Sequence, residues 1–528
     1  MSDRVAALMQ ALQTAQTDEA RQWIAMQFSL DSLSSDVREA VWVAAIPQWF
    51  DKTLLDSLLE QPLSEADFNT LTSLSYIEPF PLDGFFDVHE STRKLLLAKL
   101  YQDDLQRYRK LNRRSAKYCE QQNQEELRWR VATLYHQVLA DLDGIEVDFY
   151  NQATDWWNGF QRDKIEALLR PMLEEVTAHR VDEKIIAPTY CWQGVLDDFY
   201  GRPFSAKDYL EQAVQLFQQL ADRFSEAESI LRLGVVHVSL SEYEEARTAY
   251  QKALPLFQQI GEKLGEANCI YSLGDVHLRL SDYEAARTAY QKALLLFQQI
   301  GDKLGEANCI RSLGQILAAQ EHIELAIQTF KQAAELYHSI GLVVDEAGCF
   351  DTIANIYHVQ KCYEESLAAY QQAIEIYPKG KYWYHNRART YIAMEKYDLA
   401  LQNIEQAEKT GTHLEYLQKH RGMIALWQQQ PQTAVELLQH ATQQRPKDGS
   451  FQCALALALL ANGNAEAFAT METGLKLTYR KKSVENLLED LDKLVRIYGE
   501  RGEFAQMRTL LTQELMQRSE MPSEPASS

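Results

Sequence analysis

The residues of this chain that could do chemistry do not assemble into any motif typical of catalysis. The phosphate-binding loop GxxxxGK[ST] does not occur, and Gly380 and Lys381 form a Gly-Lys pair without a glycine at the required distance before it. The segment HESTR at His89 has one of the two histidines that a zinc-protease helix needs. No GxSxG turn, no Cys/His zinc spacing and no glycine-rich dinucleotide loop occurs. We therefore expect no enzyme activity, no cofactor and no metal.

The cysteines are the next candidates, because Cys269, Cys309 and Cys349 recur at a constant interval. A metal needs ligands that converge within a few ångströms, whereas packed helices lie about 10 Å apart. These cysteines are therefore expected to be small buried packing residues. The total of seven cysteines is odd and includes no CxxC pair, which favours a reducing compartment over a disulfide scaffold.

A series of small residues recurs at the same interval as these cysteines, and the interval becomes shorter farther along the chain. The repeated small positions are Gly194, Gly234, Gly274, Gly314, Ala354, Ala388 and Gly422. Alanine returns at two fixed places after most of them, as Ala286 and Ala293 follow Gly274. In several copies an aromatic residue such as Tyr290 lies between the two alanines.

This register resembles the tetratricopeptide repeat family, whose unit combines a small residue, an aromatic, two alanines and a closing proline. Pro378 and Pro446 occupy the place of that proline. The resemblance covers residues 187–480 and implies helix pairs stacked into a right-handed superhelix with an inner groove. The small residue should let the paired helices approach closely, so a large side chain at Gly274 should be destabilising.

The length of the copies is a further point of resemblance. The later copies have the family's ordinary length of about 34 residues, and the earlier copies are longer, at about 40 residues. Such lengthened units are typical of these arrays in bacterial signalling proteins and in motor light chains.

The resemblance also indicates where a partner would bind, because the first helix of each pair lines the groove. The candidate contact residues are Asn268, Tyr271, Asp275, Arg279, Asn308, Arg311, Gln315, Asn355, His358, Tyr382, His385, Asn386, Arg389 and Lys419. Their mixed polar and aromatic character suits a protein or peptide held by hydrogen bonds and stacking, although an ordinary solvated helix face has a similar composition. The densest group is Tyr382, His385, Asn386 and Arg389. The family's clamp for a terminal carboxylate is not expected, because Asp351 stands where the clamp needs lysine.

The N-terminal residues do not repeat and predict three helices followed by a hairpin. These four elements are expected over 34–49, 52–61, 64–75 and 76–90. The third helix should begin with a capping box of Ser64 and Asp67. This order resembles the winged-helix region that precedes tetratricopeptide sensors in STAND-type signalling ATPases. The resemblance implies that His89 contacts a nucleotide phosphate, and that a separate nucleotide-binding partner supplies the missing ATPase core.

A basic run over 91–120 raises a second possibility. It contains nine basic residues against three acidic ones, namely Arg93, Lys94, Lys99, Arg107, Arg109, Lys110, Arg113, Arg114 and Lys117. Such a run can contact nucleic acid, form a solvated helix face, or dock acidic helices such as those of the repeat array. The predicted third helix carries Glu65 and Asp67 without lysine or arginine, which would repel DNA phosphate. The alternative function is a transcription regulator with a DNA-reading winged helix and a ligand-sensing array.

The composition of the chain further limits the classes of molecule that it is expected to bind. The 53 basic and 75 acidic residues give a net charge of −22, which argues against general attraction to nucleic acid or anionic lipid. No stretch approaches the roughly 20 apolar residues of a membrane span, and the first residues lack a signal-peptide run. We therefore expect a cytoplasmic interaction scaffold or sensor without membrane contact.

The predicted fold is all-α, a right-handed α-solenoid preceded by a small winged-helix-like domain. The predicted parts are a winged-helix-like domain (1–120), a helical linker or degenerate entry repeat (121–186), the repeat array (187–480), a divergent capping repeat (481–516) and a disordered tail (517–528).

Overall fold

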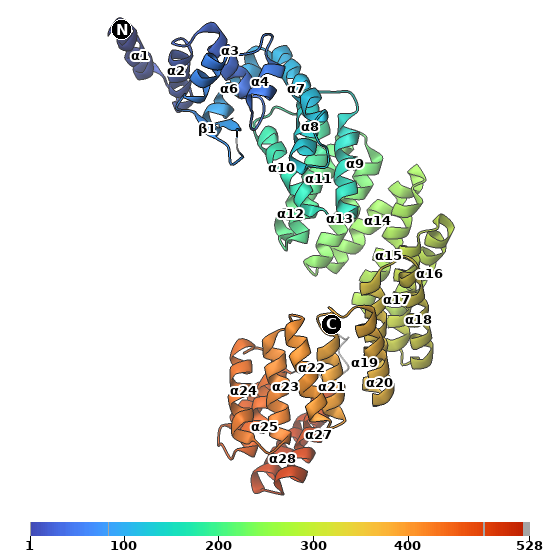
Figure 1. Ribbon diagram of the computed structural model, residues 1–528. Helices are drawn as coiled ribbons and strands as arrows, with labels where there is room; N and C mark the ends of the chain where they lie inside the picture. Colours follow the sequence, from blue (N-terminus) through green and yellow to red (C-terminus); the bar gives the residue numbers. More distant parts are fainter. Residues whose placement is uncertain (1, 83, 479–480, 521–528) are drawn as a thin grey trace. The chain divides into compact units, whose positions relative to one another are not determined.

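The computed structural model describes residues 2–82, 84–478 and 481–520 of the chain (Figure 1). One two-stranded hairpin is present, and the other regular elements of the described residues are helices, which confirms the all-α class. The chain divides into two compact units, Met1–Gly261 and Glu262–Ser528. Within the described residues no helix is both long enough and apolar enough to cross a membrane.

The first unit begins with short helices and the hairpin. These elements are α1 (Ser2–Thr14), α2 (Asp18–Leu30), α3 (Ser35–Ala44), α4 (Lys52–Leu58), α5 (Glu65–Thr72), β1 (Ile77–Pro79) and β2 (Phe86–Val88). The strands pair antiparallel with Ile77 opposite Val88, and Phe50 forms an isolated bridge to Phe86. The three predicted helices and the hairpin are therefore all present.

Two local details depart from or refine the expectations. The helix predicted over 34–49 ends at Ala44, because Pro47 disfavours helical backbone in the residue before it. At the start of α5 the Ser64 hydroxyl accepts the backbone N–H of Asp67 at 3.1 Å and donates to the Asp67 carboxylate at 2.6 Å. The cap thus forms, and the acidic side chain bonds the serine hydroxyl.

The first unit continues with long helices, several of which pack in consecutive pairs. They are α6 (Glu90–Asp103), α7 (Leu105–Glu120), α8 (Leu127–Leu139), α9 (Ile145–Asn158), α10 (Arg162–Thr177), α11 (Glu183–Phe199), α12 (Pro203–Gln219), α13 (Arg223–Ser239) and α14 (Tyr243–Ile260). A continuous apolar core runs from Met26 in α2 to Leu196 in α11.

The second unit is helical throughout its described residues. Its helices are α15 (Lys263–Arg279), α16 (Tyr283–Ile300), α17 (Lys303–Ala319), α18 (Ile323–Ser339), α19 (Val343–Val359), α20 (Tyr363–Ile376), α21 (Trp383–Ala393), α22 (Tyr397–Lys409), α23 (Leu414–Trp427), α24 (Pro431–Gln444), α25 (Gly449–Ala461), α26 (Ala467–Leu477), α27 (Lys481–Tyr498) and α28 (Gly502–Glu520). The predicted tail over 517–528 begins inside α28, and its residues 521–528 lie outside the described residues.

Each repeated glycine lies under a large side chain from the second helix of its pair. A Cβ placed on Gly274 would lie 2.7 Å from Cε1 of Tyr290, and one on Gly422 would lie 2.6 Å from Cγ of Leu438. The close approach predicted at these glycines is therefore an approach of helix backbone to a buried side chain. Both Tyr290 and Leu438 are fully buried, so neither ring nor branch has room to withdraw.

The periodic cysteines belong to the same buried layer. Cys269, Cys309 and Cys349 are fully buried, and none of the three forms a disulfide. Burial raises the pKa of Cys309 and Cys349 to about 12, so these thiols stay protonated at physiological pH. They behave as the small packing residues that the sequence predicted.

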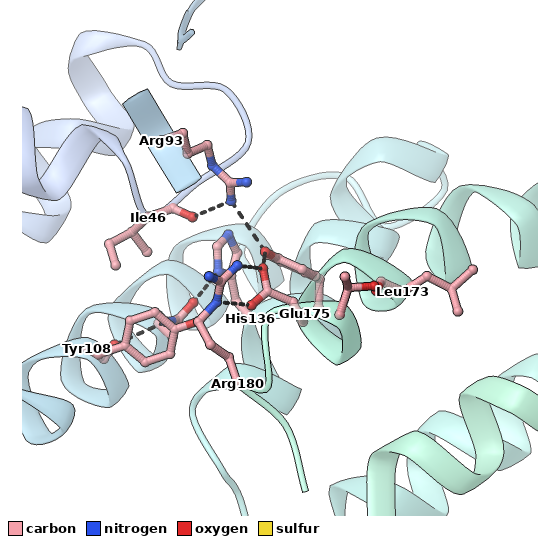
Figure 2. Close-up of polar contacts among 10 residues, drawn as sticks. Ile46, Arg93, Tyr108, His136, Leu173, Glu175 and Arg180 are labelled. Carbon is pink, nitrogen blue, oxygen red and sulfur yellow. Dashed lines mark hydrogen bonds and ion pairs between the residues drawn. The ribbon is translucent and has the colours of Figure 1, made fainter. Parts of the chain in front are cut away.

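A buried polar network joins α6, α8 and α10 in the first unit (Figure 2). The Arg180 guanidinium donates twice to the Glu175 carboxylate, at 2.6 and 3.1 Å, and the Tyr135 hydroxyl donates to the same carboxylate at 2.7 Å. Arg93 donates to the Tyr135 hydroxyl at 3.3 Å and to the Ile46 carbonyl at 3.2 Å. The buried Glu175 carboxylate thus pairs with Arg180 and is linked to Arg93 through the Tyr135 hydroxyl, which connects the hairpin-bearing segment to the helices that follow.

An adjoining pair extends this network without adding charge. The His136 ring lies 2.8 Å from Oδ1 of Asn112, whose amide donates to the Tyr108 carbonyl at 3.0 Å. Burial, and then the charge of Arg93, lowers the pKa of His136 to about 3. The imidazole is therefore neutral at physiological pH.

The replacements Gly274→Ala and Gly348→Ala form a matched test of the repeat packing. Both glycines lie inside first helices, but among the described residues nothing outside its own helix lies within 4 Å of a Cβ at Gly348. We expect Gly348→Ala to raise the free energy of unfolding by about 0.5–1 kcal/mol. Gly274→Ala should lower it by about 1–3 kcal/mol, because Tyr290 must move. Denaturant titration followed by circular dichroism measures both, and equal effects would contradict the contact.

The replacement Glu175→Gln tests the buried network. It keeps the shape of the side chain but leaves the buried Arg180 guanidinium without its carboxylate, so the free energy of unfolding should fall by about 3–5 kcal/mol. The control Glu90→Gln removes the exposed ion pair with Lys94 and should change stability little. Denaturant titration of the full chain compares the two, and a Glu175→Gln variant as stable as the parent would rule out this role.

Candidate functional site

The predicted contact residues all lie in the second unit, on the first helices of its pairs or at their starts. Asn268, Tyr271, Asp275 and Arg279 belong to α15, and Asn308, Arg311 and Gln315 belong to α17. Asn355 and His358 lie on α19, Tyr382 precedes α21, His385, Asn386 and Arg389 lie on α21, and Lys419 lies on α23. Their spacing of three or four positions places them along one face of each helix.

On α15 and α17 several of these side chains bond neighbouring helices. The Tyr290 hydroxyl of α16 donates to Asp275 at 2.7 Å, and the Tyr337 hydroxyl of α18 donates to Asn308 at 2.6 Å. The Tyr271 hydroxyl lies 3.3 Å from the hydroxyl of Ser312. These three polar groups therefore stabilise the stacking of the helices, while Arg279 and Gln315 remain exposed.

A denser arrangement, the α19–α23 cluster, comprises Asp351, Asn355, His385, Asn386, Arg389, Lys419 and His420. Asp351 accepts the Asn386 amide at 3.0 Å and the Asn355 amide at 3.1 Å. Burial raises the pKa of Asp351, and the Asn386 hydrogen bond and the charge of Arg389 offset part of this rise. The amides of Asn355 and Asn386 thus already hold a carboxylate of the chain itself.

Two histidines of this cluster bond each other. The Nε2 atoms of His385 and His420 lie 2.9 Å apart, so one ring donates and the other accepts. Burial, and then the charges of Arg389 and Lys419, lowers the pKa of His385 to about 4, and burial likewise lowers the pKa of His420. Within the described residues no three His, Cys, Asp or Glu side chains are grouped to hold a metal. Both imidazole rings are therefore neutral at physiological pH, and they are joined by a hydrogen bond between uncharged groups.

The groups left for a partner are cationic and aromatic. Arg389 is exposed, and no hydrogen bond or ion pair engages its guanidinium anywhere in the described part of the chain. Tyr382 is 43% exposed, with the Lys381 ammonium 5.4 Å from its ring centroid. Lys419 donates to the Ser450 hydroxyl at 2.8 Å and lies 4.8 Å from the centroid of the Phe451 ring. This surface can bind carboxylate or carbonyl oxygens and stack a planar group.

The sequence did not indicate His420. The repeat register pairs His385 with Lys419, and His420 is one position farther along, so a search by register passes over it. The sequence offers one signal for His420, namely its adjacency to Lys419 on α23. That signal is weak, because neighbouring residues of a helix point in different directions.

The basic run over 91–120 is largely satisfied inside the first unit. Its ion pairs join Lys94 to Glu90, Arg107 to Glu39, Arg109 to Asp141, and Lys110 to Glu60. Arg93 and Arg114 also donate to backbone carbonyls, those of Ile46 and Leu58. These acidic partners come from nearby helices and loops of the same unit.

The histidine pair predicts a pH dependence of stability. Each imidazole takes up a proton in the unfolded chain near its ordinary pKa of about 6.5, but His385 resists protonation in the folded chain until about pH 4. The unfolded state therefore binds more protons in this range, and stability should fall as pH drops from 6.5 to 4. The double variant His385→Gln, His420→Gln should show a shallower fall. Thermal unfolding at several pH values checks this, with identical slopes as the contrary result.

Comparison with known proteins agrees with the repeat architecture. Residues 201–259 and 266–339 match the family model of the tetratricopeptide repeat, so both units contain such repeats. No curated protein matches the chain by sequence.

Several solved structures are similar to the chain. A Signal Transduction ATPase with Numerous Domains (STAND) protein with a tetratricopeptide repeat sensor, from Pyrococcus horikoshii, is 13% identical with a TM-score of 0.42 over 93% of this chain and 69% of that one. A tetratricopeptide repeat protein from Parabacteroides merdae is 18% identical with a TM-score of 0.38, over 52% and 99%. The quorum sensor NprR from B. thuringiensis is 12% identical with a TM-score of 0.46, over 63% and 99%.

Proposed function

We propose that the chain is a non-catalytic scaffold or sensor that binds an extended peptide or protein segment on the α19–α23 cluster. The observation that carries this proposal is the exposed Arg389 guanidinium, which has no partner among the described residues while the polar groups around it are paired. A ligand oxygen that bonds Arg389 therefore breaks no existing contact. This lowers the cost of binding at that point.

The chemistry of the cluster favours a segment with an acidic side chain next to an aromatic or planar one. Arg389 and Lys419 supply positive charge on a chain whose net charge is −22, so an acidic partner is attracted to this patch and repelled by much of the remaining surface. The exposed Tyr382 ring supplies a stacking surface at the start of α21. Arginine and tyrosine are also the residues that most often dominate binding energy at interfaces.

The variants Arg389→Ala and Tyr382→Ala test this surface. Affinity capture with the full chain should recover a defined protein or peptide, whose affinity is then measured by titration calorimetry. We expect each variant to weaken binding by about tenfold or more, equivalent to roughly 1.4 kcal/mol. The control Lys331→Ala changes an exposed cation on α18, a second helix, and should bind as the parent does. Equal affinity of all four proteins would place the binding surface elsewhere.

We also propose that the N-terminal elements form a winged helix and that the chain is the regulatory half of a STAND-like system. The support is the order α3, bridged Phe50, α4, α5 and the β1–β2 hairpin, followed by an exposed His89 at the start of α6. The His89 ring bonds the Ser91 hydroxyl at 2.9 Å and remains accessible to a partner. Ion pairs of Arg107, Arg109 and Lys110 with acidic residues of the same unit offset part of the charge of the basic run, so we do not favour the transcription regulator.

Capture of a nucleotide-binding protein by the full chain tests the regulatory proposal. The captured protein should contain a phosphate-binding loop, and its binding should depend on added ATP. His89→Ala should weaken that dependence without altering the circular dichroism spectrum, because His89 is exposed. Capture that ignores both nucleotide and His89 would refute the proposal.

A further inference from the structure

A pocket of about 310 Å³ opens between α21, α23, α25 and α27 at the C-terminal end of the repeats. Lys419, His420 and Met423 come from α23, and Asp490 comes from α27. This volume is at the lower end of the range of small-molecule sites, so the pocket is sized for a small ligand.

The pocket contains two opposite charges that do not neutralise each other. Lys419 and Asp490 both line it, yet they form no ion pair, and no described residue makes a hydrogen bond or ion pair with the Asp490 carboxylate. Burial raises the pKa of Asp490 to about 6, and the nearby charge of Lys493 offsets part of this rise. A carboxylate in such surroundings gains stability from any cation that reaches it.

The remaining wall is largely apolar. Ile392, Met423, Trp427, Leu457 and Leu487 contribute hydrocarbon surface to the same pocket. Ser450 and Ser483 place hydroxyl groups on it, and the Ser450 hydroxyl is the one that Lys419 bonds at 2.8 Å. An occupant that matches this wall has an apolar body and two separated charges of opposite sign.

We propose that this pocket binds a free α-amino acid with an apolar side chain. The ligand ammonium pairs with Asp490, the ligand carboxylate pairs with Lys419, and the side chain contacts Met423, Trp427 and Leu457. A purely cationic ligand is disfavoured because Lys419 faces the same space, and a purely anionic one is disfavoured by Asp490. The site goes beyond the proposed peptide-binding surface, and it adjoins that surface through Lys419 and His420.

Titration calorimetry of the full chain with L-leucine and the other apolar L-amino acids tests the site. L-leucinamide lacks the carboxylate and stands for the first residue of a peptide, whereas N-acetyl-L-leucine lacks the ammonium. We expect at least one amino acid of the set to bind. The amide and the N-acetyl derivative of that amino acid should each bind at least tenfold more weakly than the amino acid itself. Absence of binding by every amino acid at millimolar concentration would overturn the proposal. An amide derivative that binds as tightly as the amino acid would overturn it as well.

Two variants of α27 complete the experiment. Asp490→Asn removes the proposed partner of the ligand ammonium and should lower the affinity for the amino acid at least tenfold. Thermal unfolding verifies that the variant is folded. Asp492→Asn is the matched control, because Asp492 is exposed on the same helix and pairs with Arg508 at 2.5 Å. Unchanged affinity in Asp490→Asn, or an equal loss in Asp492→Asn, would overturn the assignment. The peptide-binding test uses Arg389 and Tyr382, so the two proposals can fail separately.

Discussion

The contact between a side-chain-free helix position and a buried ring or branch is the constraint on which the repeats depend. In the unit from Gly274 to Tyr290, a single added carbon on the first helix would overlap the ring on the second. The contact ties the two helices of a pair together at one height and one rotation. The residues on the opposite face of the first helix then point in a direction that the buried face has already determined.

The face of each first helix that lies opposite the buried face makes different contacts along the second unit. On α15 and α17, Asp275 and Asn308 accept hydrogen bonds from tyrosine hydroxyls of the following helices, so their polar side chains stabilise the packing of the helices. From α19 onward, the amides of Asn355 and Asn386 instead converge on Asp351, and the histidines bond each other. Within the α19–α23 cluster, Arg389 is the charged side chain to which the described residues supply no such contact, which makes this cluster more suitable for recognition than the earlier helices.

Much of the architecture could be predicted from residue type and interval alone. Gly274, Tyr290, Ala286 and Ala293 keep a register that requires paired helices, and the N-terminal hairpin follows from its turn and flanking apolar residues. Helix ends were harder to predict, as Pro47 shows by ending α3 early.

The candidate site could be predicted only in part. The first helices follow from the repeat, so the positions of Tyr382, His385, Asn386 and Arg389 on or beside α21 could be expected. Which polar groups are already paired depends on side-chain distances across helices, and no interval in the sequence encodes them. His420 and Asp490 illustrate this: one lies outside the register, and the other comes from α27, beyond the regular copies. The partners of the basic run, such as Glu39 and Asp141, are equally remote in sequence.

The sameness of neighbouring copies has a consequence for how the chain reaches its native state. The helix pairs α15–α16 and α17–α18 begin with nearly the same sequence and present the same aromatic-over-glycine geometry at Gly274 and Gly314. A first helix that docks on the wrong second helix, one whole copy away, would recover most of its native contacts. We expect such a slipped intermediate to be a kinetic trap, which the dissimilar ends of the array and copy-specific contacts such as that of Tyr290 with Asp275 distinguish from the correct pairing.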